Sequence, residues 1–118
     1  MKENKLAELS MEFAVDIINL VRQLKENREA IIYNQIGRSG TSIGANIHEA
    51  NYGQSKADFV SKLQIALKEC YESEYWLALF AKTNIISDEI YTKLKNDCGK
   101  IRKLLIASIN TTKERYNL

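Results

Sequence analysis

The sequence lacks proline altogether and is poor in glycine, cysteine and histidine. Its 118 residues include no proline, five glycines, two cysteines and one histidine. Without proline, no expected helix is broken or kinked by a proline ring. Two cysteines make no disulfide framework, and with one distant histidine they make no zinc site. We therefore expect Cys70 and Cys98 to be buried, reduced thiols, and we expect no metal and no cofactor.

The sequence also lacks a strong excess of one charge and any long apolar run. It has 17 basic and 15 acidic residues, with 45% hydrophobic and 27% charged residues. That balance is typical of a globular helical domain and excludes a disordered polycation. The N-terminus is charged rather than an apolar signal core, and no run reaches the roughly 20 apolar residues that span a bilayer. We expect one cytoplasmic domain, residues 1–118, with no membrane contact.

What the sequence does contain is helical periodicity, in four stretches. We expect helices over Lys5–Asn27, Glu29–Tyr52, Lys56–Thr83 and Asp88–Arg115, because apolar residues recur there at spacings of three and four. The expected core faces are Leu6, Leu9, Phe13, Ile17, Leu20 and Leu24, widened by Ile18 and Val21; Ile36, Ile43, Ile47 and Ala50; Phe59, Leu63, Ala66, Leu67, Cys70, Leu77 and Ala81; and Leu94, Cys98, Ile101, Leu105, Ile109 and Thr112. Short connections favour antiparallel neighbours. The sequence therefore predicts an all-α, antiparallel up-down-up-down four-helix bundle, the alternative being a pair of helical hairpins completed by a second chain.

Small and polar residues mark the helix ends and one close contact. Gly53 is a candidate C-terminal cap, Ser55 with Asp58 resembles a capping box, and Ser87 is a candidate N-cap. Gly40 lies on an apolar face with Gly44 beside it. Each glycine costs a helix about 1 kcal/mol relative to alanine, so their presence there predicts the close approach of a neighbouring helix.

A polar stripe runs along the second expected helix. At about 100° per residue, Arg38, Ser42 and Glu49 share one side, with Asn46 at its edge. An ordinary solvated face usually carries more lysine and glutamate. The alternatives are a buried polar network, which Glu72 of the next helix could join, and a surface that meets another subunit.

The third expected helix has a second apolar stripe, nearly opposite its core face. Ile65, Glu72, Trp76 and Leu79 line it. A monomeric bundle needs only one buried face per helix, so a second one predicts contact with further copies of the chain. The alternative is a scatter of surface hydrophobic residues, which is common.

Positive charge gathers toward the C-terminus. From Asn84 onward there are seven basic and four acidic residues. Lys93, Lys100 and Lys103 share one side of the last expected helix, away from its core face. Repeated on every subunit of a closed ring, this stripe could bind phosphate backbones without reading sequence. A solubilising face explains it equally well.

Signals for catalysis are weak. His48 is expected to be exposed, and no Glu-x-x-His pair recurs as in di-iron bundles. The run Gly37–Ser42 is rich in glycine and hydroxyls, but it lacks the Gly-Lys-Ser/Thr ending of a phosphate-binding loop and no strand precedes it. We predict that the chain is not an enzyme and has no catalytic residue.

The run from Gln35 to Ala50, followed by Ser55–Phe59, Ala66–Leu67 and Glu72, resembles the signature of the bacterial four helix bundle protein family. These are also called 23S rRNA intervening-sequence proteins. The resemblance implies an up-down bundle that assembles into a homopentameric ring. It also implies kinship with the accessory variability protein of diversity-generating retroelements, a basic pentamer that binds nucleic acid and a reverse transcriptase. The positions that match the family are Arg38, Ser42, Asn46, Glu49 and Glu72.

These patterns lead to one functional prediction and one alternative. The prediction is a non-enzymatic, oligomeric bundle that binds RNA or DNA, as an accessory to a nucleic-acid enzyme such as a reverse transcriptase. The alternative is a structural or protein-interaction module without nucleic-acid contact.

Overall fold

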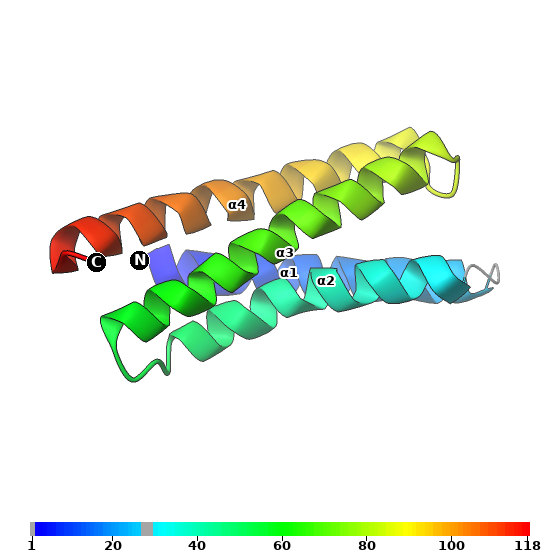
Figure 1. Ribbon diagram of the computed structural model, residues 1–118. Coiled ribbons are helices and arrows are strands. Elements are labelled where there is room, and N and C mark those ends of the chain that lie inside the picture. The colour runs from blue at the N-terminus through cyan, green and yellow to red at the C-terminus, as the bar shows by residue number, and fades with distance from the viewer. Residues whose placement is uncertain (1, 27–29) are drawn as a thin grey trace.

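Long helices make up almost all of the described chain (Figure 1). The structure is a computed structural model that describes residues 2–26 and 30–118. The described residues form α1 (Lys2–Glu26), α2 (Ala30–Ala50), α3 (Lys56–Lys82) and α4 (Asp88–Tyr116), and no strand. The all-α prediction is thus confirmed.

The predicted helix boundaries agree with the structure to within three residues where both can be compared. α1 begins at Lys2 rather than Lys5, α2 ends at Ala50 rather than Tyr52, and α4 continues to Tyr116. The predicted end of the first helix at Asn27 and the predicted start of the second at Glu29 lie outside the described residues.

The four helices form a closed bundle in which sequence neighbours lie side by side. α2 contacts α1 and α3, and α4 contacts α3 and α1, whereas the described parts of the diagonal pairs α1–α3 and α2–α4 make no such contacts. The bundle measures 48 × 22 × 20 Å, and α1 begins at the end where α4 stops (Figure 1). This is the predicted up-down-up-down order. Because one chain closes its own core, the alternative of two hairpins completed by a second chain is wrong.

The core consists almost entirely of the residues that the periodicity selects. Every member of the expected α1, α2 and α4 faces is buried or packed against the core, except Thr112, which is half-buried, and Ile18. Ile18 does not widen the core, because its side chain remains 41% exposed. On α3 the core also includes Val60, Ser73 and Phe80, which the periodicity did not select.

Two glycines of α2 lie against α1. A Cβ atom on Gly40 would lie 2.7 Å from Cγ1 of Ile17, and one on Gly44 would lie 3.5 Å from the backbone oxygen of Ser10. Gly40 therefore has no room for a side chain, while Gly44 has ordinary contact distance. The predicted close approach is confirmed, and its neighbour is α1.

The caps of α3 and α4 follow the prediction, but Gly53 does not. The Ser55 and Ser87 hydroxyls accept hydrogen bonds from the amides of Asp58 (3.0 Å) and Ile90 (3.1 Å). Gly53 does not form a left-handed C-terminal cap, because no described glycine has positive φ. Glycine fits this position because the space is crowded. A Cβ on residue 53 would lie 3.2 Å from an atom of each of Ala50, Asp58 and Phe59.

Candidate functional site

α4 carries the main excess of positive charge. Between Lys93 and Lys113 it has six basic residues and a single acidic one, Asp97. Lys100 and Lys103 are exposed, as predicted. Neither makes an ion pair with any carboxylate among the described side chains. Their charges are therefore available to an external anion.

Lys93, the third member of the predicted basic stripe, forms ion pairs within the chain. Its Nζ lies 2.9 Å from Oδ2 of Asp97 and 3.0 Å from Oδ2 of Asp16 on α1. Hydrogen bonds to Asp97 and Asp16 raise the pKa of Lys93, so its charge is fixed and balanced by two carboxylates. Lys93 thus fastens α4 to α1 and contributes little to a free basic surface.

Arg102 is likewise occupied, on the side of α4 that faces α3. Its Nε donates to Oε2 of Glu74 at 3.0 Å, and this bond raises the pKa of Arg102. The guanidinium also lies 5.8 Å from the ring centroid of Tyr71. Lys93 and Arg102, at the edges of α4 next to α1 and α3, are thus paired. Lys100 and Lys103, on the solvent side of the helix, are not paired with any described side chain.

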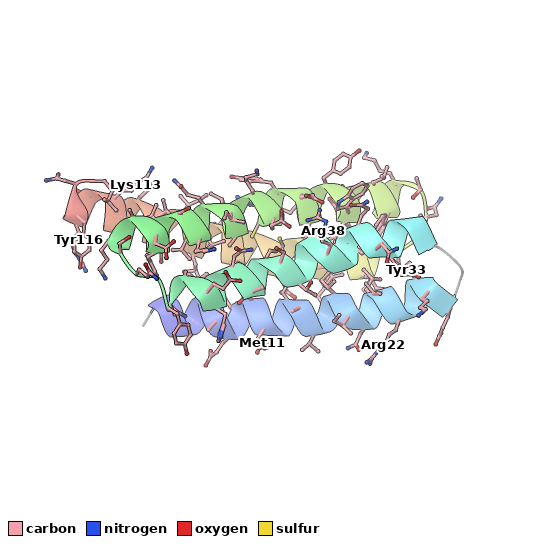
Figure 2. The ribbon with its side chains drawn as sticks, turned by 60° about the horizontal axis from the view of Figure 1, so that its bottom comes forward. Met11, Arg22, Tyr33, Arg38, Lys113 and Tyr116 are labelled. Atoms are coloured by element: carbon pink, nitrogen blue, oxygen red, sulfur yellow. The ribbon has the colours of Figure 1, made fainter. Side chains whose placement is uncertain are left out.

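The predicted polar stripe of α2 forms ion pairs with α3 at the surface. Arg38 donates to Glu69 Oε2 at 3.0 Å and, through its other terminal nitrogen, to Glu72 Oε2. The indole Nε1 of Trp76 donates to the same oxygen of Glu72 at 2.9 Å. The Arg38 side chain is 53% exposed, so the buried-network interpretation of this stripe is wrong (Figure 2).

The rest of the stripe makes local or cross-helix bonds of the same kind. The Asn46 amide donates to the Ser42 carbonyl (2.9 Å) and hydroxyl (3.1 Å), and Glu49 pairs with Lys62 of α3 at 3.2 Å. The stripe therefore joins α2 to α3 within one chain. Its role in contacting another subunit stays a prediction.

The buried polar contact between α2 and α3 is one that sequence reasoning missed. The hydroxyl of Ser73 donates to that of Ser39 at 2.9 Å, and both residues are fully buried. Serine is small enough to occupy a core position without disturbing the apolar period, so the periodicity gave no signal. The position of Ser39, next to Gly40 on the core side of the helix, was the available clue.

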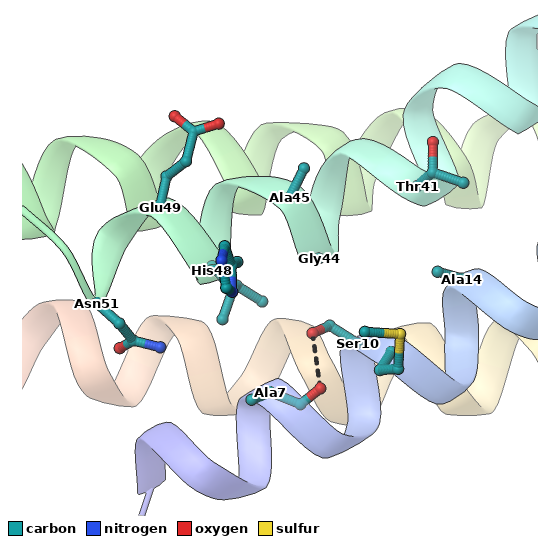
Figure 3. A pocket seen from close by; sticks show the side chains of 11 residues that line it. Ala7, Ser10, Ala14, Thr41, Gly44, Ala45, His48, Glu49 and Asn51 are labelled. Carbon is teal, nitrogen blue, oxygen red and sulfur yellow. Dashed lines mark hydrogen bonds between the residues drawn. The ribbon is translucent and has the colours of Figure 1, made fainter.

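An apolar groove runs between α1 and α2 (Figure 3). It encloses about 500 Å³. Alanine, serine and glycine are about half of its lining residues, and the exposed Met11 is one of the others (Figure 2). The residues that line it are Ala7, Ser10, Met11, Ala14, Thr41, Gly44, Ala45, Ile47, His48, Glu49 and Asn51.

The predicted second stripe of α3 is only partly an outer face. Ile65 is 41% and Leu79 38% exposed. Trp76 instead packs against the core, with its ring centroid 6.4 Å from that of Phe80. The tryptophan that made this stripe conspicuous is thus largely explained within the chain. Its role as a subunit contact stays a prediction.

The remaining reactive groups are buried or isolated. Cys70 and Cys98 are buried, free thiols, as expected, and a hydrogen bond to Cys70 together with burial raises the pKa of the Cys98 thiol. His48 is exposed beside Tyr52, and the Gly37–Ser42 run lies inside α2 rather than in a loop. Within the part of the chain that the structure describes, no group of three or more histidine, cysteine or acidic side chains could hold a metal ion. Among the described helices none is both long and apolar enough to cross a membrane.

A family model described as "23S rRNA-intervening sequence protein" matches residues 2–107. The chain belongs to this family. The chain is also similar to a protein of unknown function from Bacteroides thetaiotaomicron, which is assigned to the S23 ribosomal protein family and has a crystal structure at 1.70 Å. The two sequences are 52% identical. The similarity covers 93% of this chain and 99% of the other, with a TM-score of 0.91. No curated protein matches the chain.

Proposed function

We propose that this member of the family is a non-enzymatic, self-associating bundle that binds the phosphate backbone of RNA or DNA through α4. The observation that carries the proposal is the exposed pair Lys100 and Lys103, on a helix segment with six basic residues and one acidic residue. Lys93 and Arg102, on the sides of α4 that face α1 and α3, form ion pairs within the chain. Lys100 and Lys103 lie between them and form none with any described side chain. Lysine binds phosphate as a point charge without reading base sequence.

Self-association strengthens such a surface. One copy offers only a few free lysines on the described part of α4, and so few phosphate contacts give weak binding. Several copies held together bind one strand through all their α4 helices at once, which raises the overall affinity without any new contact. The resemblance to the family implies five copies. Its description names an intervening sequence of 23S rRNA, which makes ribosomal RNA the first ligand to test.

A salt series tests the nucleic-acid part of the proposal. We expect fluorescently labelled, mixed-sequence RNA to bind wild-type protein at low salt, with an affinity that falls linearly on a log–log plot. Lys100→Glu with Lys103→Glu should abolish binding. Because Lys93 is already balanced by Asp16 and Asp97, Lys93→Gln is the matched control and should change the affinity less than threefold.

Two results would contradict nucleic-acid binding by α4. One is an absence of binding at low salt, and the other is binding that the double variant retains unchanged. Either would favour the second candidate, a protein-interaction module without nucleic-acid contact. The observation that favours this candidate is the apolar groove between α1 and α2, because a groove of this kind suits a protein side chain rather than a phosphate.

A further inference from the structure

Cations and tyrosine rings occur together where α3 runs beside α4. The described part of the chain has three contacts between a cation and an aromatic ring, and every one of them is made by these two helices. Such contacts place a positive charge and a flat ring next to each other at the surface. The pairs, with the distance from the cation to the ring centroid, are Lys95 with Tyr91 (5.6 Å), Arg102 with Tyr71 (5.8 Å) and Lys56 with Tyr116 (5.1 Å).

One side of α4 supplies most of these residues, and it faces α3. Arg102 donates a hydrogen bond to Glu74, which identifies the side of α4 that is turned toward α3. Positions 7 or 11 residues apart return to nearly the same side of a helix, because the helix has 3.6 residues per turn. Lys95 lies 7 residues from Arg102, and Tyr91 and Lys113 each lie 11 residues from it. These residues therefore border one surface with Tyr71 of α3, which we call the α3–α4 face.

The α3–α4 face has positive charge that the chain does not balance. Lys95 and Lys113 are exposed, as is Lys103 beside them, and none of the three forms an ion pair with a described side chain. Glu74 on this face is balanced by Arg102. On the side of α4 that faces α1, a lysine is instead matched by two carboxylates. The α3–α4 face is thus the side of α4 that suits a chain of phosphates.

The tyrosines of this face are accessible to a flat ligand. Tyr71 is 53% exposed. A hollow of about 260 Å³ lies beside Tyr91, and small alanine side chains of α3 keep it open. A nucleobase is flat and aromatic, so it stacks on a tyrosine ring while its phosphate reaches a neighbouring lysine. The residues that line the hollow are Ala78, Ala81, Lys82, Asp88 and Tyr91.

We infer that an unpaired nucleic-acid strand binds along the α3–α4 face, with bases stacked on Tyr71 and Tyr91 and phosphates on the lysines beside them. This inference rests on nucleic-acid binding by α4 in the proposed function and specifies the form of the ligand. Tyr71 lies level with Arg102, about 16 Å of helix rise from Tyr91, so one strand passes both rings. In a duplex both faces of every base are covered by its neighbours, which leaves the tyrosines nothing to stack on.

One RNA sequence in two forms tests the inference. We expect a labelled single strand of about 16 nucleotides to bind wild-type protein about tenfold more tightly than the same strand annealed to its complement. Tyr71→Leu with Tyr91→Leu removes the rings and keeps apolar bulk. It should weaken single-strand binding about tenfold and leave duplex binding unchanged. Tyr71→Phe with Tyr91→Phe keeps the rings and should bind as wild type.

Two further variants keep this test decisive. Tyr91 packs partly against the core, whereas Tyr71 does not, so Tyr71→Leu alone serves if the double variant unfolds in circular dichroism. It should weaken single-strand binding about fivefold. Tyr52, which follows α2, is 76% exposed and lies off the α3–α4 face. Tyr52→Leu is the matched control and should bind as wild type.

The salt dependence of the same titration separates stacking from charge. Lys95→Gln with Lys113→Gln should lower the log–log slope by about 1.4, because each phosphate contact on a single strand contributes about 0.7. The leucine variants should keep the wild-type slope and lose affinity equally at every salt concentration, because stacking releases no counterions.

Three outcomes would overturn the inference while wild-type protein still binds RNA. They are equal affinity for single strand and duplex, leucine variants that bind as wild type, and a phenylalanine variant that loses as much affinity as the leucine variant. The Lys100→Glu, Lys103→Glu variant judges the proposed function separately, since it leaves the tyrosines intact. A wild-type protein that binds neither form of RNA at low salt would overturn both the inference and nucleic-acid binding by α4.

Discussion

Small side chains set how closely the helices approach at the scale of single residues. Gly40 meets Ile17 of α1, and the Ser39 and Ser73 hydroxyls meet each other between α2 and α3. Adding or removing a single methyl group or hydroxyl at such positions changes the stability of the fold, because protein cores are packed as densely as crystals.

We expect Gly40→Ala to destabilise the protein although alanine is the better helix former. The added Cβ would lie 2.7 and 3.0 Å from the γ carbons of the buried, β-branched Ile17, which cannot turn aside. Overpacking of this kind costs about 1–3 kcal/mol and outweighs a propensity gain of about 1 kcal/mol. Gly99→Ala is the control and should stabilise by about 0.5–1 kcal/mol, because its Cβ would meet only Arg102 at 3.5 Å. Urea unfolding measures both, and a stabilised Gly40→Ala would contradict the packing described above.

Cys98 should make the stability fall at alkaline pH. Its pKa is raised in the folded state by the bond to Cys70 and by burial, so the folded thiol keeps a proton that the unfolded chain loses above pH about 8.5. The contribution is fully present below that pH and is lost as the pH rises. The free energy of unfolding should therefore fall by up to about 1.4 kcal/mol per pH unit more steeply in wild type than in Cys98→Ala. Equal slopes in urea titrations from pH 7 to 10 would refute a protonated, buried thiol.

At the scale of the elements, the helices could be predicted from sequence and most of their lateral contacts could not. Core faces, N-caps and the four-helix order follow from periodicity and capping chemistry, which are local. Ion pairs such as Lys93 with Asp16 join residues far apart in sequence, and nothing local indicates which lysine finds a carboxylate. For the same reason the periodicity places Trp76 on an outer face, although Trp76 stacks on Phe80 and donates a hydrogen bond to Glu72.

The buried hydroxyl pair Ser39 and Ser73 joins α2 to α3. Replacing Ser73 or Ser39 alone by alanine leaves the partner hydroxyl buried without its 2.9 Å bond, which should cost about 1–2 kcal/mol. Replacing both removes the two polar groups together, so the double variant should be more stable than either single one. Thermal or urea unfolding of the four proteins completes the cycle. A double variant whose loss is the sum of the two single losses would show that the hydroxyls act independently.

At the scale of the whole molecule, the bundle presents different chemistry on different sides. Apolar faces lie on α1 and α3, an ion-paired surface joins α2 to α3, and free lysines lie on the outer side of α4. Each helix has a buried face that explains the fold and an outer face that the fold does not need. Self-association through the exposed apolar residues of α1 and α3 would leave the outer side of α4 open. Self-association and nucleic-acid binding can therefore coexist on one small chain.

Sedimentation velocity followed at two wavelengths, with labelled ribosomal RNA and unlabelled protein at low salt, tests this account most directly. We predict that the wild-type chain sediments as a discrete oligomer and that the RNA moves with it. The Lys100→Glu, Lys103→Glu variant should form the same oligomer and leave the RNA behind. A wild-type protein that sediments as a single chain, with the RNA moving alone, would contradict both self-association and RNA binding by α4.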